Sequence, residues 1–185
     1  MLTTPGCPMK ITLDPHCIVH LAGRTVTGAR IAQIISRRDA SCYVVNIACA
    51  PVRDRGVRPE HYEHFEGLLA TAGVGHLPRL DPLFVCDVTF WGKGVPASDE
   101  MARLAQGLGD ALYGEAPGGE MPFEGPDSPA GRRWLERHCG VQAMLCHIRN
   151  RHDVFLTTDG TLKRDALRPK LNALGAGRVC LPGEV

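Results

Sequence analysis

The chain has 185 residues, of which 44% are hydrophobic and 22% charged, and its formal net charge is +1. This composition excludes overall disorder, and the length favours one domain with a sizeable core over two independent domains. The near-neutral charge argues against a surface that is basic all round, so any face that binds nucleic acid must be local. No apolar run reaches the ~18 residues of a membrane-spanning helix. Residues 1–10 also lack the pattern of a secretory signal, so the expected location is the cytoplasm.

The eight cysteines are scattered along the chain and form no C-x-x-C pair. Most of them lie in apolar runs, where a thiol behaves as a small hydrophobic group, so we expect reduced core cysteines. The alternative is a metal site made by His138, Cys139, Cys146 and His147, although their spacing matches no common zinc pattern.

Short apolar runs alternate with segments of helical periodicity, which is typical of βα units and a mainly parallel sheet. The predicted strands are, in chain order, residues 9–13, 42–48, 83–90, 153–157 and 178–181. The predicted helices include two over 18–35 that are broken near Gly23 and Gly28, and one that starts at Pro59 and ends at Gly73. Later helices follow Ser98 and Ser128 as N-caps, the second of them interrupted at Gly140, and a short helix covers 169–174.

Residues 114–131 contain four prolines and several glycines. This composition predicts an irregular insertion at the surface. Because the chain that follows is too short to fold alone, we expect a single domain over residues 1–185.

Two carboxylates directly follow predicted strands, where sites form in open α/β sheets. Asp14 follows the first strand, and Asp159 follows the strand over 153–157. If these strands are neighbours, about 4.8 Å apart, both carboxylates could reach one Mg²⁺ or Mn²⁺ ion, which needs only one or two protein carboxylates. The alternative is that each aspartate caps the helix after it.

The two ends of the chain carry distinctive motifs, namely I-T-L-D-P-H-C-I-V-H-L (11–21) and A-M-L-C-H-I-R-N-R-H-D-V-F-L-T-T-D (143–159). The first is similar to the opening motif of PIN domains, and the second to the later motif of the same family. The tail after Leu162 resembles the closing helix and last strand. The resemblance implies a single-domain PIN-like α/β fold with three layers, in which helices flank a mostly parallel sheet of five strands. It also implies an endoribonuclease that uses Mg²⁺ or Mn²⁺ and is in many relatives the toxin of a toxin-antitoxin pair. The implied partners are RNA, an antitoxin protein and a second copy of the chain.

The resemblance places two of the four family acids. Asp14 matches the first and Asp159 the fourth, so both are expected to be catalytic and to bind the metal. Thr157 matches the threonine that precedes the fourth acid by two residues. Pro15 and His16 replace the usual threonine and asparagine after the first acid, so the hydrogen bonding around Asp14 must differ from the family pattern.

The other two family acids are missing. The best alignment puts Pro51 at the second acid and Gly140 at the third. Asp54 and Glu136 are the nearest substitutes and are therefore further catalytic candidates, although each could equally be a solvated surface carboxylate. Metal-dependent phosphodiester hydrolysis relies on the carboxylate cluster to fix the cation. A catalytically degenerate PIN-like module that binds RNA or a protein partner is therefore the alternative function.

The segment 131–170 carries nine Lys and Arg against four acids. Local clusters of this kind bind phosphate backbones, although a solvated helical surface has the same composition. The predicted contacts to nucleic acid are Arg149, Arg151, Lys163 and Arg164.

Overall fold

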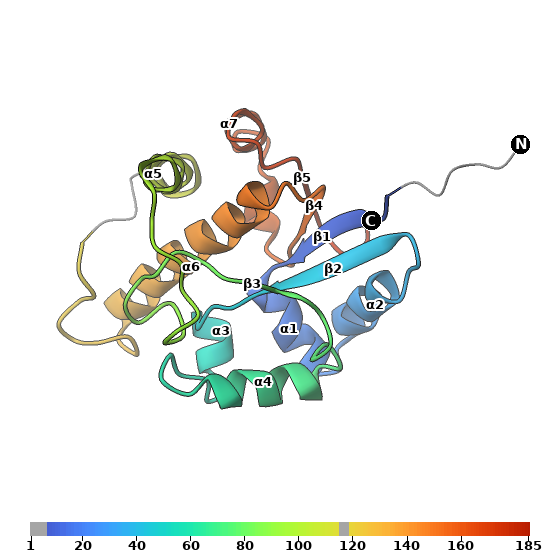
Figure 1. Cartoon of the computed structure of the whole chain (residues 1–185), viewed down its shortest axis with the longest axis horizontal. Helices are drawn as coiled ribbons and strands as arrows, with labels where there is room; N and C mark the ends of the chain where they lie inside the picture. Colours follow the sequence, from blue (N-terminus) through green and yellow to red (C-terminus); the bar gives the residue numbers. More distant parts are fainter. Residues whose placement is uncertain (1–6, 115–118) are drawn as a thin grey trace, which may run out of the picture.

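The computed structural model describes residues 7–114 and 119–185. Its centre is a five-stranded sheet in the order β3-β2-β1-β4-β5, and every strand pair is parallel (Figure 1). The strands are β1 (Met9–Leu13), β2 (Ala40–Val45), β3 (Arg79–Leu80), β4 (Val154–Leu156) and β5 (Arg178–Cys180). The predicted three-layer α/β fold with a parallel sheet of five strands is confirmed.

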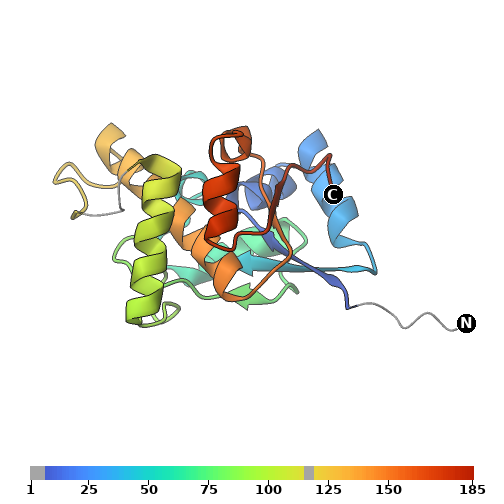
Figure 2. The same ribbon diagram turned by 90° about the horizontal axis from the view of Figure 1, so that it is seen from above.

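Helices cover both faces of the sheet (Figures 1 and 2). The chain first steps from β1 to β3 in one direction and then crosses back to β4, and because crossovers are right-handed this reversal moves the later helices to the opposite face. The first group is α1 (Pro15–Ala22), α2 (Val26–Ile35), α3 (Ala50–Arg53) and α4 (Tyr62–Thr71). The second group is α5 (Asp99–Tyr113), α6 (Pro129–Arg149), the 3₁₀ helix η1 (Gly160–Lys163) and α7 (Arg168–Ala173). None of the helices in the described ranges is long and apolar enough to cross a membrane.

The central strands are buried from both sides. Successive side chains of a strand point to opposite faces, and Ile11, Thr12 and Leu13 of β1 are at most 1% exposed. Val154, Phe155 and Leu156 of β4 are at most 2% exposed. A parallel sheet with helices on both faces requires such runs of apolar residues, and this is why the strands could be recognised in the sequence.

Two glycines that were predicted to interrupt helices lie inside them. The break between α1 and α2 falls after Ala22, and Gly28 is part of α2. A Cβ at residue 28 would lie 2.2 Å from the carbonyl oxygen of His20, so glycine here allows α1 and α2 to touch. Gly140 likewise lies within the continuous helix α6, so the predicted break is wrong. A glycine inside a helix costs only about 1 kcal/mol relative to alanine, which tertiary packing overrides.

The predicted strand over residues 83–90 is also wrong, since this segment is irregular and β3 lies earlier in the chain. The amide of Leu83 donates to the side chain of Gln142 on α6 rather than to a neighbouring strand. The Thr89 hydroxyl closes a turn on Val85, and the buried guanidinium of Arg53 donates to the Asp87 carbonyl. These side chains satisfy the backbone groups that a strand would have paired.

Smaller differences occur at element ends. Pro59 precedes α4 rather than starting it, because a tight turn in which the His61 amide donates to the Arg58 carbonyl (3.0 Å) comes before the helix. β2 ends at Val45, three residues earlier than predicted. Of the predicted irregular insertion, residues 119–128 contain no helix or strand, and residues 115–118 lie outside the described part of the chain.

A buried network of two histidines and one threonine joins α6 to β1. The Nε2 atom of His147 lies 2.7 Å from the Ala176 carbonyl oxygen and must donate to it, so Nδ1 accepts from the Thr12 hydroxyl at 3.0 Å. The Thr12 oxygen in turn accepts from Nδ1 of His152 at 2.8 Å. Burial lowers the pKa of His147 to about 4, so this imidazole is neutral in the folded protein.

Because His147 is buried in its neutral form, we expect the folded protein to lose stability in mild acid. His147 has an ordinary pKa near 6.5 in the unfolded chain, so unfolding takes up a proton and becomes easier as the pH falls from 6.5 towards 4. This residue alone should lower the free energy of unfolding by about 2 kcal/mol between pH 7 and pH 5. Urea unfolding at both pH values measures the loss. His147→Gln, which cannot be protonated, should show a smaller pH dependence, and an unchanged dependence would contradict the assignment.

Candidate active-site cleft

A cleft of about 900 Å³ opens at the carboxyl ends of β1, β2 and β4. Its walls come from α1, α3, the end of α5, the first half of α6, and the segment from Asp159 to Leu167. The strand order reverses between β1 and β4, which is where ligand sites form in open α/β sheets. All four predicted acids, Asp14, Asp54, Glu136 and Asp159, line this one cleft.

Asp14 is held in place by three hydrogen bonds. Its Oδ1 accepts from the backbone amide of His16 at 3.1 Å and from the His16 ring at Nδ1 at 3.0 Å, and its Oδ2 accepts from the Thr157 hydroxyl. The side chain is 9% exposed. Because a carboxylate offers about four acceptor positions, only one is left for another ligand.

The Thr157 hydroxyl connects Asp14 to Asp159. This oxygen is fully buried, donates to Asp14, and accepts from the backbone amide of Asp159 at 3.0 Å. The Asp159 carboxylate accepts from the amide and the hydroxyl of Thr161, both at 2.8 Å. Each aspartate therefore caps the following helix, as the alternative interpretation predicted, and the two also lie on either side of one hydroxyl at the cleft.

The ring of His16 lies beside the Asp14 carboxylate and carries a positive charge. The hydrogen bond to Asp14 raises the pKa of His16 to about 9, against the opposing effect of partial burial. The ring is therefore protonated at neutral pH. Since Nδ1 is used by Asp14, Nε2–H is the donor that remains, and the ring is 45% exposed at the cleft.

The two substitute acids have different surroundings. Asp54 follows α3 and forms a bidentate ion pair with Arg132 of α6, with N to O distances of 2.8 and 3.3 Å. Glu136 is exposed one helical turn before Gly140. The structure thus brings both residues to the cleft, and of the two only Asp54 is paired with a cation within the described part of the chain.

Tyr113 occupies the space next to Gly140. A Cβ at residue 140 would lie 2.2 Å from the Tyr113 hydroxyl oxygen, which donates to the Glu136 carbonyl at 3.4 Å. Burial raises the pKa of Tyr113, so the phenol stays neutral. Any side chain at the position of the third family acid would collide with this ring.

The cleft is rich in arginine. Five arginines line it, namely Arg55, Arg132, Arg133, Arg137 and Arg164. Among the lining residues that the structure describes, these arginines and the protonated His16 outnumber the four carboxylates by two positive charges. A cleft with this balance attracts a polyanion.

The four predicted nucleic-acid contacts are dispersed. Arg164 lines the cleft, whereas Lys163 points to the other side of η1 and pairs with Glu184. Arg149 donates to the Asp81 carbonyl at 2.7 Å, and Arg151 lies beyond the end of α6.

Sequence reasoning missed His16, Tyr113, Arg55 after α3, and the arginines of α6 as cleft residues. Helical spacing could have identified some of these cleft residues. Four residues of α6 lie three or four positions apart and therefore share one face of the helix, namely Arg133, Glu136, Arg137 and Gly140. No sequence pattern pointed to Tyr113, which comes from a different helix.

Within residues 7–114 and 119–185, no group of three or more His, Cys, Asp or Glu side chains is placed to hold a metal ion. The alternative site at His138, Cys139, Cys146 and His147 is therefore not formed. His147 belongs to the buried network, and His138 stacks on Trp134 with a ring separation of 3.8 Å. All cysteines of the described ranges are free thiols, in agreement with the prediction.

Comparison with known protein families, curated proteins and solved structures found no match. The chemistry of the cleft must therefore be judged from its own residues.

Proposed function

We propose that the chain is a divalent-metal-dependent endoribonuclease with Asp14 and Asp159 as metal ligands. The observation that carries this proposal is the Asp14–Thr157–Asp159 connection at the floor of an arginine-lined cleft. The Thr157 hydroxyl orients the Asp14 carboxylate and accepts from the backbone amide of Asp159, while Thr161 holds the Asp159 carboxylate. Two carboxylates held in place after neighbouring strands suit a hard cation, which takes oxygen ligands.

The residues present fit a single Mg²⁺ or Mn²⁺ ion. Mg²⁺ keeps several waters and uses one or two protein carboxylates together with phosphate oxygens. Asp14 has one acceptor position left, and each oxygen of Asp159 accepts one hydrogen bond and has one position left. When bound, the ion would act as a Lewis acid that stabilises charge on the phosphodiester.

The protein side chains supply the other functions. Phosphates on both sides of the scissile bond are neutralised by Arg55 after α3, by the arginines of α6 and by Arg164 between η1 and α7. The Nε2–H of His16 is available to donate to a phosphate oxygen. The resemblance to PIN domains and the arginine cleft support RNA as the substrate. The toxin role, the antitoxin partner, dimer formation and the cytoplasmic location rest on the sequence alone and stay predictions.

A second candidate is RNA binding without cleavage. It is favoured by the neutralisation of two of the four acids, since His16 pairs with Asp14 and Arg132 pairs with Asp54. Tyr113 also takes the place of a third acid next to Gly140. In this case the same cleft holds the RNA backbone, and no cation is fixed.

One experiment separates the two candidates. A fluorescent single-stranded RNA is incubated with the protein in Mn²⁺, in Mg²⁺ or in EDTA, with binding followed by anisotropy and cleavage by gel. Cleavage that needs the cation supports the nuclease. Binding without cleavage in all three conditions supports the second candidate, and the absence of both would contradict each of them.

A further inference from the structure

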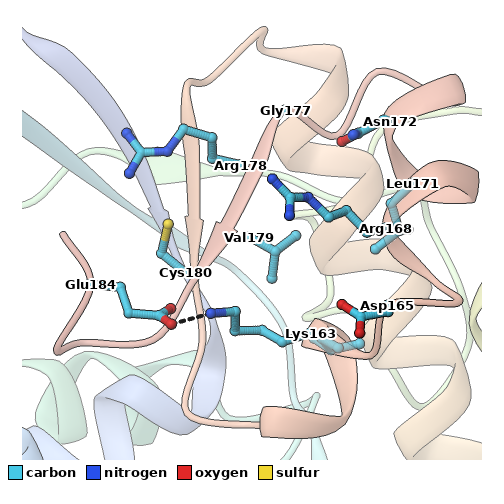
Figure 3. A pocket seen from close by; sticks show the side chains of 11 residues that line it. Lys163, Asp165, Arg168, Leu171, Asn172, Gly177, Arg178, Val179, Cys180 and Glu184 are labelled. Atoms are coloured by element: carbon cyan, nitrogen blue, oxygen red, sulfur yellow. Dashed lines mark hydrogen bonds and ion pairs between the residues drawn. The ribbon is translucent and has the colours of Figure 1, made fainter.

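A second cavity of about 430 Å³ lies beside the edge strand β5, and we name it the β5 groove (Figure 3). Leu162, Leu171 and Val179 provide apolar lining, and Lys163 and Arg168 provide positive charge. Leu162 lines both this groove and the cleft. The segment Leu162–Arg168 is thus a ridge that separates the two, with Arg164 on the cleft side and Lys163 and Arg168 on the groove side.

The edge of β5 offers backbone groups to the groove. The Arg178 amide donates to the Asp153 carbonyl at 3.3 Å, and the Cys180 carbonyl accepts from the Thr157 amide at 3.0 Å. In a parallel ladder such bonded residues alternate with residues that face the other way. The N–H and C=O of Val179 therefore point away from β4, along the open edge of the sheet.

The cations of the groove differ in their surroundings. Lys163 is paired with Glu184, which also accepts from the Leu181 amide at 2.7 Å (Figure 3). The guanidinium of Arg168 extends from α7 over β5 towards Val179, whereas Arg178 projects to the other side of the strand. Among the described residues no side-chain partner of Arg168 is found. Two carboxylates, Asp165 and Glu184, also line the groove, and Glu184 is the one that pairs with Lys163. The groove therefore presents the guanidinium of Arg168, for which the described residues provide no ion pair, next to the backbone N–H of Val179.

We propose that the β5 groove is a second subsite for the RNA strand and binds a backbone phosphate through Arg168 and the amide of Val179. This inference rests on the proposed RNA-binding function and extends it. A strand that leaves the cleft past Arg164 crosses the ridge at Leu162 and meets Arg168 next. Guanidinium and amide donors are the groups that recognise phosphate oxygens in proteins.

The test compares Arg168→Gln with Lys170→Gln, which removes the same charge from an exposed position of α7 that lines neither cavity. Binding of a fluorescent oligouridine is measured by anisotropy at several salt concentrations, in EDTA so that no cleavage occurs. We expect Arg168→Gln to weaken binding about tenfold. The slope of log K against log salt should also fall by about 0.7, the value for one phosphate contact on a single strand. Lys170→Gln should change the affinity and the salt slope less than Arg168→Gln does. In the wild type, the NMR resonance of the Val179 amide should shift when oligouridine is added.

The cleft variant Arg133→Gln distinguishes failure of this inference from failure of the proposed function. If Arg133→Gln weakens binding and Arg168→Gln behaves like Lys170→Gln, the groove is not a subsite while the cleft function stands. If Arg168→Gln weakens binding and Arg133→Gln does not, the groove stands and the cleft does not. If the wild type binds no oligouridine, both proposals are wrong.

Discussion

Replacement of Asp14 by asparagine is expected to reduce metal-dependent RNA cleavage at least about 100-fold. Changing a residue that only orients a metal ligand typically costs about 10- to 100-fold in affinity or activity, so loss of a ligand should reach the upper end of that range. Asparagine has nearly the same shape and can keep the hydrogen bond from the His16 amide. The loss should therefore come from the missing charge. Single-turnover cleavage in Mn²⁺ measures the effect.

The matched control is Asp110→Asn, which removes one exposed carboxylate of α5 that lines neither cavity. It should cleave at the wild-type rate. Because Asp14 is buried and accepts three hydrogen bonds, Asp14→Asn is also expected to lower stability by about 1–2 kcal/mol, so a melting curve must show that the variant is folded at the assay temperature. Wild-type cleavage by folded Asp14→Asn would contradict the nuclease proposal.

Replacement of Gly140 by alanine is expected to destabilise the protein by about 2 kcal/mol, although alanine is the better helix former. The new Cβ would lie 2.2 Å from the Tyr113 hydroxyl oxygen, whereas the next ring atom, Cζ, is 3.4 Å away. Tyr113→Phe removes only the colliding oxygen, so the double variant should recover the lost stability. Urea unfolding of the four proteins in this cycle should give a coupling of about 2 kcal/mol, within the range for residues in contact.

Gly67→Ala is the control for helix propensity. Gly67 lies in α4 and has nothing within 4 Å of an added Cβ, so alanine should stabilise the protein by about 1 kcal/mol. If Gly140→Ala is as favourable as Gly67→Ala, Tyr113 does not fill this space.

The contact between Gly140 and Tyr113 also indicates how a metal site in the cleft could be strengthened. Gly140→Asp combined with Tyr113→Ala places a third carboxylate on the cleft face of α6 and removes the ring that excludes it. We expect Mn²⁺ affinity, measured by calorimetric titration, to rise at least about tenfold. The same double change combined with Asp14→Asn should lose most of this gain.

The parts of the fold that the sequence predicted correctly are those determined by local pattern. β1 and β4 are apolar runs that end just before Asp14 and Thr157, and burial on both faces makes such runs visible. The Ser98 and Ser128 caps were predicted correctly for the same reason, because an N-cap depends on residues three positions apart.

The errors come from contacts between residues distant in sequence. The segment 83–90 has the composition of a strand. However, the Leu83 amide donates to the side chain of Gln142 on α6, which lies 59 residues later in the chain. Gly140 is a helix breaker by propensity, yet it lies inside the continuous helix α6, and Tyr113 from α5 fills the space that its missing side chain leaves. His16 was seen only as a departure from the family pattern, since its charge depends on a buried carboxylate that the sequence does not reveal.

The buried network at His147 has a consequence for motion in the cleft. α6 is buried almost continuously from His138 to His147. Of residues 129–137 only Gly131 and Leu135 are buried, and Arg132 and Arg133 are exposed. One end of the helix is therefore fixed to β1 through Thr12, and the other end forms a cleft wall with fewer buried residues, held by the Ser128 cap and the exposed Arg132–Asp54 ion pair. Local opening requires least energy where few apolar contacts are broken. We therefore expect α6 to open first at the end that carries Arg132 and Arg133, while the end near His147 stays attached to β1.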